Sequence, residues 1–375
     1  MDNKLNDNNR KTILACRYCP MCRHVCSSEF ISYRESDTPR GRAILLYNIY
    51  EGGKQYEHDT IDSIYNCFLC GCCLSWCQGY EEGGYNIPEL IKFARRDIVC
   101  QGLEPQAIKD LKEVIIEKGS IYEINKSDSI TYDIDEKQAE VLYYLGTDVN
   151  FKNKEIAKST ISILKKSGID FTILKDESDS GKILDLLGYR QDAQKLATVL
   201  YNRIKNTGCK LIITSDPLAY DAFKNDYSEY GLKFLPEIEV MHVSEFLCEL
   251  AECKKIKFKN SSGRVAVVDS EYIGRYNQIF DAPRKLVEMI PGTELVELQW
   301  SKNEMLATGE SAFYFSNPNK NIGKELGKKL LKLANDIKVD TLITLSAIAK
   351  NNIREAHPNC IEVIDVAEFI AKLMV

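Results

Sequence analysis

Two short runs of cysteine near the start of the chain share one spacing. Each run reads C-x2-C-x2-C-x3-C, the first from residue 16 to 26 and the second from residue 67 to 77. Together they hold eight of the 14 cysteines in the 375 residues, so thiol chemistry constrains this part of the chain more than core packing does. The eight residues are Cys16, Cys19, Cys22 and Cys26, then Cys67, Cys70, Cys73 and Cys77.

This spacing is typical of the loops that hold 4Fe–4S clusters. Three thiolates two residues apart wrap around one face of a cube, and the fourth cannot reach the same cube, so it normally binds the other cluster. Two runs therefore predict two clusters with a crossed ligand pattern. The first cluster would be held by Cys16, Cys19, Cys22 and Cys77, and the second by Cys67, Cys70, Cys73 and Cys26.

A structural zinc site and a disulfide framework are the alternatives. Zinc usually takes two C-x2-C pairs and has no use for a third cysteine at the same pitch. Disulfide frameworks are typical of small secreted domains, whereas this chain is long and we expect no secretory leader in it. Cys72, beside Cys73, is extra: it is either a competing ligand or a free thiol, and we expect the free thiol.

The charge balance and the short apolar runs limit the function. The formal net charge is −6, whereas nucleic-acid binders normally present a basic face. No apolar run approaches the ~20 residues needed to cross a bilayer. The opening residues, 1 to about 12, are polar, lack signal-peptide features and are expected to form a frayed arm. We therefore expect a cytoplasmic protein without a transmembrane segment that binds no nucleic acid and meets a membrane only through a partner.

Residues 1–106 are predicted to be mostly helical, with short helices between the cysteine loops. Residues 38–42, which include Pro39, precede an apolar helix predicted at 43–50, and Pro88 opens another at 89–94. Proline suits a first helical turn because its missing N–H would be unpaired there anyway. Arg40 and Arg42 follow the first of these prolines. They either offset the negative charge of thiolate-bound clusters or form a solvated pair at a helix start.

After a connector at residues 107–137, which contains a helix at 107–118, the pattern changes. Strands alternate with helices, which implies a parallel sheet covered on both faces. The strand runs lie at 141–145, 171–174 and 211–214, with helices at 154–166, at 191–206 and from 217 onward.

The strand and helix pattern then repeats. Residues 196–216 align with 326–346, and both segments end in a strand, at 211–214 and 341–344. Internal duplication predicts a pseudo-twofold pair of lobes with a cleft between them. Strands at 264–268 and 294–298 open the second copy, so the lobes should span 138–260 and 261–375.

Over nearly its whole length the chain resembles a family of iron–sulfur subunits. The family contains the heterodisulfide reductase D-type subunit, the glycolate oxidase iron–sulfur subunit and the C-type subunit of anaerobic glycerol-3-phosphate dehydrogenase. The resemblance implies that residues 1–106 form an α-helical ferredoxin domain and that each α/β lobe is a cysteine-rich domain. It rests on the two cysteine runs, Pro39-Arg40-Gly41-Arg42, Gly274-Arg275, Ala282-Pro283-Arg284-Lys285-Leu286, and Gly181 with Gly188.

The lobes depart from the family pattern at the cysteine turns, which in heterodisulfide reductases carry the disulfide-reducing centre. Ala, Thr and Ser cannot replace thiolates and still hold a soft iron–sulfur cluster. We therefore expect degenerate cysteine-rich domains that keep the fold and have lost the metal. The positions at which the family has cysteines are occupied by Thr147, Asp179-Ser180 and Asp216-Pro217 in the first lobe, and by Glu271, Ala307-Thr308 and Ser346-Ala347 in the second.

The cysteines outside the runs are expected to be ordinary packing residues, since free cysteine is among the most buried residue types. They are Cys100, Cys209, Cys248, Cys253 and Cys360.

Polar residues follow the strands where the lost ligands would lie. Asp216 with Tyr220, and Glu271 with Tyr272, form either a remnant pocket at the sheet edge or structural polar fill, and we expect the fill. His24, inside the first run, is expected either to hydrogen-bond a cluster or to contact solvent. No G-x-G-x-x-G loop follows a strand, so we expect no flavin or nicotinamide site in this chain.

These observations predict an iron–sulfur electron-transfer subunit without catalytic residues of its own. Two 4Fe–4S clusters would relay single electrons between a flavoprotein and another carrier, with the lobes as a docking platform. The resemblance implies an FAD-linked 2-hydroxyacid dehydrogenase or an electron-transfer flavoprotein as the partner. One alternative is an oxidoreductase subunit with a ligand site between the lobes, fed by the clusters. A weaker alternative is a redox sensor whose clusters control docking.

Overall fold

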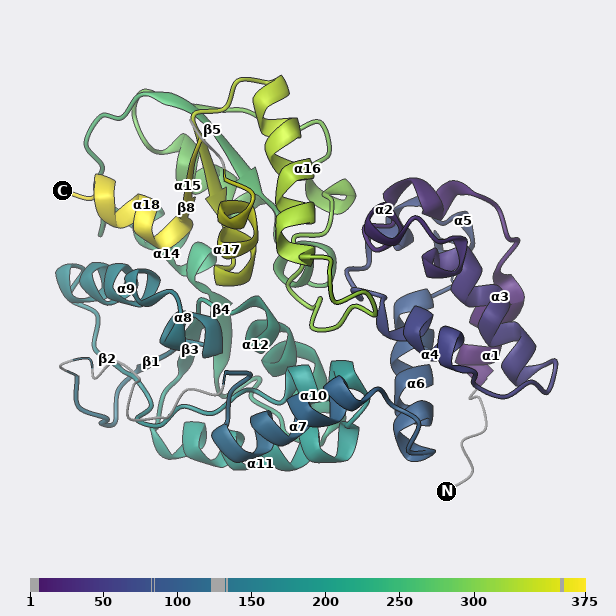
Figure 1. Ribbon diagram of the computed structural model, residues 1–375. Coiled ribbons are helices and arrows are strands. Elements are labelled where there is room, and N and C mark those ends of the chain that lie inside the picture. Colours follow the sequence, from purple (N-terminus) through teal and green to yellow (C-terminus); the bar gives the residue numbers. More distant parts are fainter. Residues whose placement is uncertain (1–6, 82, 84, 123–131, 133, 358–360) are drawn as a thin grey trace.

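The computed structural model describes residues 7–81, 83, 85–122, 132, 134–357 and 361–375. A helical part at residues 7–100, here called the cluster module, lies beside two α/β lobes (Figure 1). The first lobe comprises residues 141–252 and the second 263–373. No helix among the described residues is long and apolar enough to span a bilayer.

The cluster module contains helices and turns, and no strand is found among its described residues. Its first main helix begins at Pro39, four residues before the predicted start, and the second begins at Ile87 and runs six residues past the predicted end at 94. The side chain of Thr38 caps the first helix by accepting from the Gly41 N–H over 2.9 Å. The α-helices are α1 (Asp7–Ala15), α2 (Glu29–Ser32), α3 (Pro39–Tyr50), α4 (His58–Tyr65), α5 (Gln78–Glu81) and α6 (Ile87–Cys100). The 3-10 turns are η1 (Met21–Val25), η2 (Glu35–Asp37) and η3 (Cys72–Trp76).

The expected frayed arm is wrong for residues 7–12, which form most of α1. Ile13 on this helix is 1% exposed and belongs to the core of the cluster module, so its burial holds the helix in place. The positions before residue 7 lie outside the described residues.

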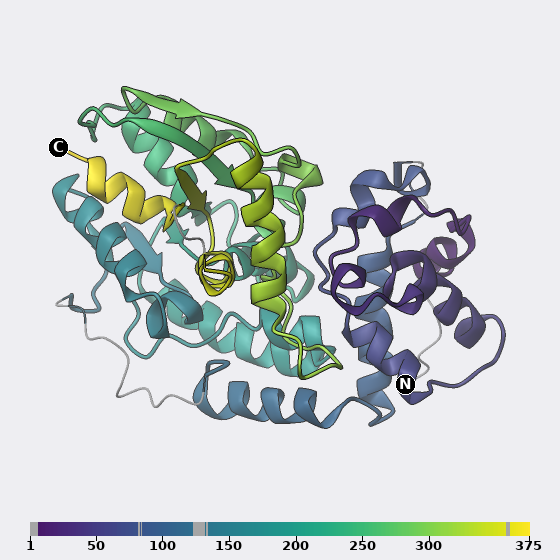
Figure 2. The same cartoon turned by 45° about the horizontal axis from the view of Figure 1, so that its top comes forward.

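The connector helix α7 (Gln106–Lys118) runs along the first lobe rather than standing between the two parts (Figure 2). Its buried side chains, Ile108 and Ile115, join a core that continues into helix α10 of that lobe. Leu184 and Leu187 of α10 belong to the same core, so the cluster module and the first lobe pack as one body.

The first lobe is a four-stranded parallel sheet with the strand order β2-β1-β3-β4. Helices cover both faces, as the alternating pattern predicted. The elements are β1 (Val141–Tyr144), α8 (Thr147–Phe151), α9 (Lys154–Lys166), β2 (Phe171–Thr172), α10 (Lys182–Leu187), α11 (Arg190–Asn206), β3 (Leu211–Thr214), α12 (Pro217–Asp221), the π-turn η5 (Ala222–Asp226), α13 (Tyr227–Glu229), β4 (Glu239–His242) and α14 (Val243–Glu252).

The second lobe repeats this order as β6-β5-β7-β8, again fully parallel. The elements are β5 (Gly263–Val268), the π-turn η6 (Glu271–Arg275), α15 (Asp281–Glu288), β6 (Thr293–Leu295), η7 (Lys302–Glu304), α16 (Ile322–Asp336), β7 (Thr341–Thr344), α17 (Ala347–Glu355), β8 (Glu362–Asp365) and α18 (Val366–Leu373).

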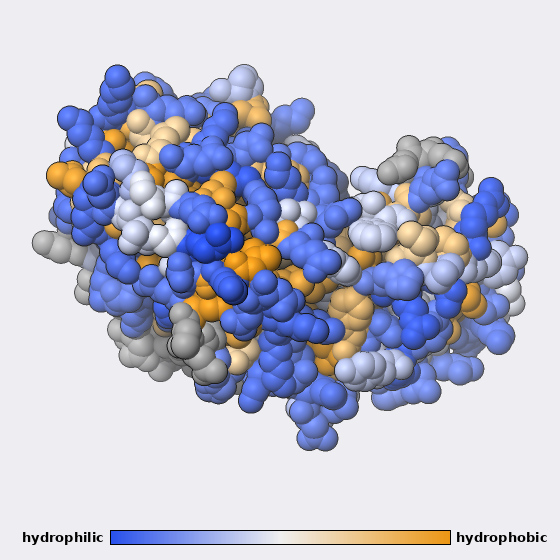
Figure 3. All heavy atoms as spheres, turned by 90° about the horizontal axis from the view of Figure 1, so that it is seen from above, coloured by the Kyte–Doolittle hydropathy of each residue, from blue (hydrophilic) through white to orange (hydrophobic). Residues whose placement is uncertain are grey.

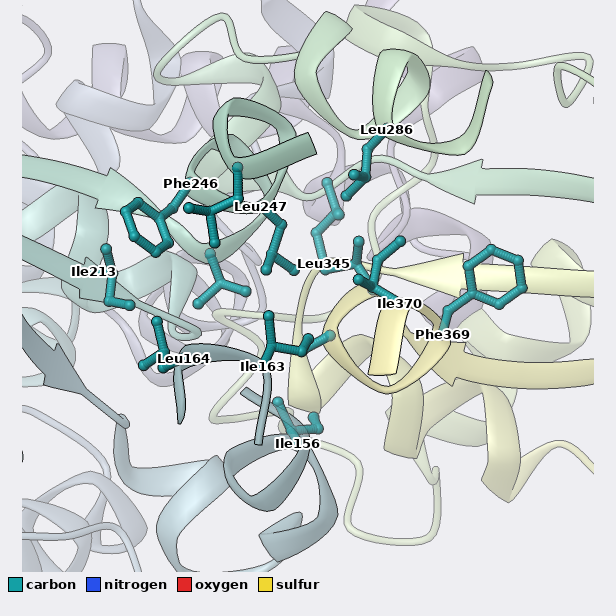
Figure 4. Packing of buried hydrophobic residues seen from close by; sticks show 14 of the residues in the cluster. Ile156, Ile163, Leu164, Ile213, Phe246, Leu247, Leu286, Leu345, Phe369 and Ile370 are labelled. Carbon is teal, nitrogen blue, oxygen red and sulfur yellow. The ribbon is translucent and has the colours of Figure 1, made fainter. Parts of the chain in front are cut away.

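Seen from above, the surface is mostly hydrophilic, with apolar side chains gathered in patches over the lobes and on the cluster module (Figure 3). The larger apolar surfaces lie inside, between the lobes. Figure 4 shows side chains from both lobes meeting in one core, including Ile163 of α9, Leu247 of α14, Leu286 of α15 and Ile370 of α18.

The helices that form this shared core pack reciprocally. Helix α14 of the first lobe packs on α15 of the second, and α18 of the second lobe packs on α9 of the first. In each lobe the helix after the last strand therefore contacts the helix that follows the first strand of the other lobe. The predicted cleft does not divide the lobes here, because their interface is a continuous apolar core.

Candidate iron–sulfur centre

Four cysteines from both runs line one small cavity inside the cluster module. They are Cys26 from the first run and Cys67, Cys70 and Cys73 from the second, with Arg42 beside them. None of these cysteines forms a disulfide. They are the four residues that the crossed pattern assigns to the second cluster, and four soft sulfurs around one enclosed space fit a 4Fe–4S cube.

The ligand set of a cube differs from that of a single ion. Among the residues that the structure describes, no three His, Cys, Asp or Glu side chains lie close enough together to hold one metal ion. A cube spreads its four thiolates over four different iron atoms, so its sulfurs surround a space rather than converge on a point. The four cysteines line the cavity from several sides, which is the arrangement that a cube requires.

The cysteines assigned to the first cluster also neighbour one another. Burial raises the pKa of the Cys16 thiol, and negative charge on Cys77 and Cys19 raises it further. Burial likewise raises the pKa of Cys22 to about 12, with contributions from Cys26, Cys16 and Cys19. Cys77 of the second run thus lies near Cys16 of the first, which the crossed ligand pattern requires. Cys19 is exposed at the surface.

Arg42 provides a positive charge beside the second cysteine set. It donates to the Ser63 carbonyl over 2.7 Å and to the Ser28 hydroxyl over 3.0 Å, and its Nη1 lies 4.0 Å from Cys26 Sγ. Burial raises the pKa of Cys26, and the Arg42 charge opposes this rise. A buried cation here favours the thiolate form that binds iron.

A second buried guanidinium, Arg95 on α6, holds the start of the second cysteine loop. Its Nη2 donates to the Cys67 carbonyl over 2.5 Å and its Nη1 to the Leu186 carbonyl of the first lobe over 2.7 Å. Arg40 bonds to the first cysteine loop instead: its Nη1 donates to the Tyr18 carbonyl over 3.3 Å, while its Nη2 pairs with Glu35 over 2.6 Å. Of these two arginine side chains, that of Arg42 is the one that approaches a cysteine sulfur.

The second lobe covers the second cysteine loop by bonding to its backbone. Arg275 Nε donates to the Cys70 carbonyl over 2.7 Å, and the Tyr276 hydroxyl donates to the Leu69 carbonyl over 2.6 Å. Further bonds across this interface join the Ser311 hydroxyl to the Phe68 carbonyl, the Ser75 hydroxyl to the Asn303 carbonyl and the Ala307 N–H to the Ser27 hydroxyl.

Cys72 belongs to this interface rather than to the cavity. Its thiol is fully buried and donates to the Met305 carbonyl over 3.4 Å. Gly71 before it has φ +73°, and a Cβ there would lie 3.3 Å from the Tyr276 ring, so the turn needs glycine. The thiol of Cys72 therefore points toward the second lobe, as a free thiol at an interface.

Of the cysteines outside the two runs, Cys209 and Cys248 are buried, as expected. The packing expectation is wrong for Cys100 and Cys253, which are exposed because they end helices α6 and α14. Cys360 lies outside the described residues.

Carboxylates occupy the strand ends of the first lobe, at the turns where the family resemblance implies cysteines. Glu177 accepts from the backbone N–H of Leu145 over 2.9 Å and of Gly146 over 2.8 Å. Asp179 accepts from the Gly181 N–H over 2.7 Å. Burial raises the pKa of Glu177 to about 8 and that of Asp179 to about 6.

Asp216 completes this group at the start of α12, where its side chain accepts from the Leu218 N–H over 2.9 Å. Burial raises its pKa to about 7, and charge on Asp148 and Asp179 adds to the rise. Gly146, at φ +85°, lies so close that a Cβ there would be 2.3 Å from Asp216 Cβ. The aspartate thus fills the space behind the first strand.

The second lobe has an equivalent pair, Glu271 and Glu310. Glu271 accepts from the Thr308 N–H over 2.7 Å, the Thr308 hydroxyl over 2.6 Å and the Gly309 N–H over 3.0 Å. Glu310 accepts from the Ser270 hydroxyl over 2.9 Å. Burial raises the pKa of Glu310 far above its usual range, and the charge of Glu271 raises it further. Glu310 is therefore the residue of this pair whose surroundings favour the protonated form.

These bonds favour structural polar fill over a remnant pocket for Glu271. Tyr272 next to it stacks on Tyr276 with ring centroids 5.0 Å apart. Tyr220 is buried with its ring edge-on to His242 at 6.5 Å. His24 is exposed, so solvent contact is the correct alternative for it.

A cavity of about 650 Å³ opens between the lobes at the carboxyl ends of their strands. Both lobes and the connector line it, and its charged residues are Asp148, Lys152, Arg354 and Glu355. The Tyr122 hydroxyl donates to Asp148, and Lys152 Nζ lies 4.2 Å from the centre of the Tyr122 ring. This is the part of the predicted cleft that exists in the structure.

Sequence reasoning gave no role to several residues that shape these sites. Arg95 lies inside an amphipathic helix, where an arginine is usually a surface residue. Glu177 and Glu310 lie next to the turns in which the expected cysteines are absent. The acidic residues near the glycines of these turns could have indicated that carboxylates take the place of thiols there. Arg275 was quoted in the family motif, and its bond to the Cys70 carbonyl is a contact across 205 residues of chain.

Comparison with known proteins places the first lobe in a described family. Residues 141–220 match the family model "Cysteine-rich domain". Across 98% of its length the chain also shares a fold, at TM-score 0.59 and 12% identity, with 72% of a hypothetical protein from Helicobacter pylori.

Curated relatives extend the match beyond the first lobe. The probable iron–sulfur-binding oxidoreductase FadF of Bacillus subtilis is 27% identical over 67% of this chain and 37% of that protein. The D-type subunit of the dihydromethanophenazine:CoB–CoM heterodisulfide reductase of Methanosarcina barkeri is 26% identical over 84% of this chain and 78% of that protein. EtfAB:quinone oxidoreductase of Syntrophomonas wolfei is 26% identical over 68% of this chain and 37% of that protein.

The chain therefore spans little more than a third of the length of FadF and of the quinone oxidoreductase, and most of the heterodisulfide reductase protein. These relatives are named as iron–sulfur or redox proteins, and the resemblance found in the sequence is confirmed. The chain is thus similar to FadF and to the D-type subunit of heterodisulfide reductase, and its residues 141–220 match the cysteine-rich domain.

Proposed function

We propose that this chain is the electron-transfer subunit of an oxidoreductase complex and carries two 4Fe–4S clusters in a crossed ligand pattern. The observation that carries the proposal is the cavity lined by Cys26 from one run and Cys67, Cys70 and Cys73 from the other. When bound, the clusters supply one-electron redox chemistry. The residues of the chain would hold the clusters and exclude water, and Arg42 would supply a positive charge beside one of them.

The names of the relatives suggest the kind of partner. One relative is named as a quinone oxidoreductase of an electron-transfer flavoprotein, and another as part of a heterodisulfide reductase. We propose a cytoplasmic complex in which a flavoprotein, either an electron-transfer flavoprotein or an FAD-linked 2-hydroxyacid dehydrogenase, performs the two-electron chemistry. The present chain would then pass electrons on singly to another carrier.

The lobes serve this function as a scaffold. We propose domains at 1–106, 138–260 and 261–375, with the last two related by duplication, a proposal that the identical strand orders support. Asp179, Asp216 and Glu271 stand where cluster ligands would be, and each accepts backbone N–H bonds. Oxygen ligands suit hard cations rather than iron–sulfur clusters, so the lobes should hold no cluster.

Anaerobic purification followed by iron and sulfide analysis tests the proposal. Two cubes give about eight iron atoms and about eight sulfides per chain. Electron paramagnetic resonance after dithionite reduction should show two interacting one-electron centres. A protein that contains zinc and no iron, or one that binds iron through its lobes, contradicts the proposal.

Cys72 and Cys73 provide a matched pair of variants for this experiment. C72A removes the thiol that bonds to the second lobe and should leave iron at about eight atoms per chain. C73A removes a cavity-lining thiol and should lose one cluster. Equal iron loss from the two variants would make Cys72 a ligand.

The 650 Å³ cavity between the lobes favours one alternative, a ligand site fed by the clusters. Lys152 and Arg354 would suit the carboxylate of a small organic acid there. Calorimetric titration with glycolate and with lactate tests this alternative, using K152A as the control. Absence of binding at millimolar concentration would leave the electron-transfer function alone.

A further inference from the structure

The two cysteine loops differ in how much of them the rest of the chain covers. The second loop is bonded to the second lobe through the carbonyls of Leu69 and Cys70, and Cys72 is fully buried beside it. The first loop is less covered, and Cys19 is exposed. Electron transfer needs close approach, so a partner meets this centre most directly at the first loop.

The exposed side chains around Cys19 form a surface of mixed apolar and basic character. Leu14 is 51% exposed, Tyr18 40% and Met21 43%. Arg17 and Arg23 lie between them and are also exposed. These five residues are here called the docking face. Large apolar side chains that are grouped and exposed mark interaction sites more often than single ones do.

The loop geometry fixes this face. Tyr18 has φ +55°, and its carbonyl accepts from Arg40 Nη1 over 3.3 Å, which ties the loop to helix α3. Two further exposed apolar residues, Ile44 at 41% and Tyr47 at 40%, stand on the neighbouring helix α3. Helix α3 packs against the turn η1, which begins with Met21 of the docking face. The apolar surface therefore continues from the loop onto α3.

The charge of this region is opposite to that of the whole chain. The chain has a net charge of −6, yet the stretch from residue 8 to 28 contains no Asp or Glu. Its cations are Arg10, Lys11, Arg17 and Arg23. Arg10 pairs with Glu51, and Arg23 with Glu29 and Glu35, whereas Lys11 and Arg17 form no ion pair among the described residues. A partner that fits this face carries acidic groups around an apolar centre.

We propose that the docking face receives an acidic flavin-bearing redox protein, which delivers single electrons to the chain beside Cys19. The first cysteine set would hold the cluster that accepts each electron from the reduced flavin of the partner, and the docking face would hold the two proteins together, with no bond formed or broken. This inference rests on the proposed function and adds the site and charge of its partner.

The test uses a flavodoxin, an acidic flavoprotein, as the probe and the iron-loaded full-length chain as the target. Binding of the oxidised flavodoxin is measured by biolayer interferometry under anaerobic conditions, so that no electron transfer is involved. R17E should weaken binding by about tenfold at low ionic strength. M21D should also weaken it, because it places a charge in the apolar centre. At ~0.5 M salt, R17E should match the unmodified chain.

The matched control is K210E, which changes the net charge equally at an exposed site of the first lobe. K210E should bind like the unmodified chain. Iron content and the rate of reduction by dithionite should be unchanged in all three variants, which shows that the variants fold and keep their clusters.

The outcomes separate the docking proposal from the electron-transfer function. Equal binding of flavodoxin by R17E and K210E, or binding that does not depend on salt, overturns the docking face. If the iron-loaded chain is not reduced even by dithionite, the proposed function fails, whatever the binding result is.

Discussion

Glu271 accepts a hydrogen bond from the Gly309 N–H over 3.0 Å, which joins the end of the first strand of the second lobe to a turn 38 residues later. Thr308 donates to the same carboxylate through both its N–H and its hydroxyl. The family resemblance implies cysteines at these turns. Here the side chain of Glu271 accepts three hydrogen bonds from the turn and holds it closed without a metal.

This arrangement predicts a stability effect without loss of iron. E271A leaves three donors without their acceptor, which should lower the free energy of unfolding by about 3 kcal/mol or more. E271Q keeps one carbonyl oxygen and should lose about half as much. Urea denaturation followed by circular dichroism measures the difference. An E271A variant as stable as the unmodified chain, or one that loses iron, would refute the structural role.

Crossed ligation can be tested by two double variants with the same number of lost thiols. In the crossed pattern Cys26 and Cys67 hold the same cluster, so C26A/C67A should keep about four iron atoms. Cys16 and Cys26 then hold different clusters, so C16A/C26A should lose nearly all the iron. Uncrossed ligation reverses the two results. Iron analysis of anaerobic samples therefore decides between the patterns.

Arg42 should raise the reduction potential of the second cluster. Its guanidinium lies 4.0 Å from Cys26 Sγ in a buried site, and a nearby cation favours the more negative, reduced form. R42M should shift that potential negatively by on the order of 60 mV, which is about 1.4 kcal/mol for one electron. R42K keeps the charge and should shift it less. Equal potentials in R42M and the unmodified chain would contradict this role.

Asp216 should make the protein less stable as the pH rises. Its pKa is about 7 in the fold, well above the usual value of 3.8. Between these values the folded protein keeps a proton that the unfolded chain has released, so stability falls from about pH 4 to pH 7 and then levels off.

D216N removes this titration and keeps the carbonyl that caps α12. It should therefore gain stability relative to the unmodified chain at pH 8, on the order of 2 kcal/mol, and little at pH 4. Thermal melts across this range give the comparison. D192N, at a surface position on α11, serves as the control and should show no such difference.

The sequence was most informative where local chemistry decides the structure. The four thiols that line the cavity are the four that the cysteine spacing assigns to one cluster, and the prolines indicate two helix starts to within four residues. The strands β4 and β8 were missed because each has four residues and joins a helix with no turn between them. In both, the last residue caps the next helix, through His242 and Asp365.

Contacts between distant segments could not be predicted in this way. The bond from Arg275 to the Cys70 carbonyl crosses 205 residues, and that from Arg95 to the Leu186 carbonyl crosses 91. Both depend on how the cluster module packs against a lobe. The raised pKa of Glu310 could not be predicted from the sequence either, because it depends on the burial of this side chain beside Glu271.

The unequal cover of the two cysteine loops implies an order of oxidative damage. Dioxygen reaches the exposed Cys19 directly, whereas Cys70 and Cys73 lie behind the second lobe. In aerated buffer, iron should leave in two phases of about four atoms each, the first set before the second. A partly oxidised molecule would then retain an inner cluster that outside donors can no longer reach, so brief exposure to air would disable the protein before most of its iron-binding structure is lost.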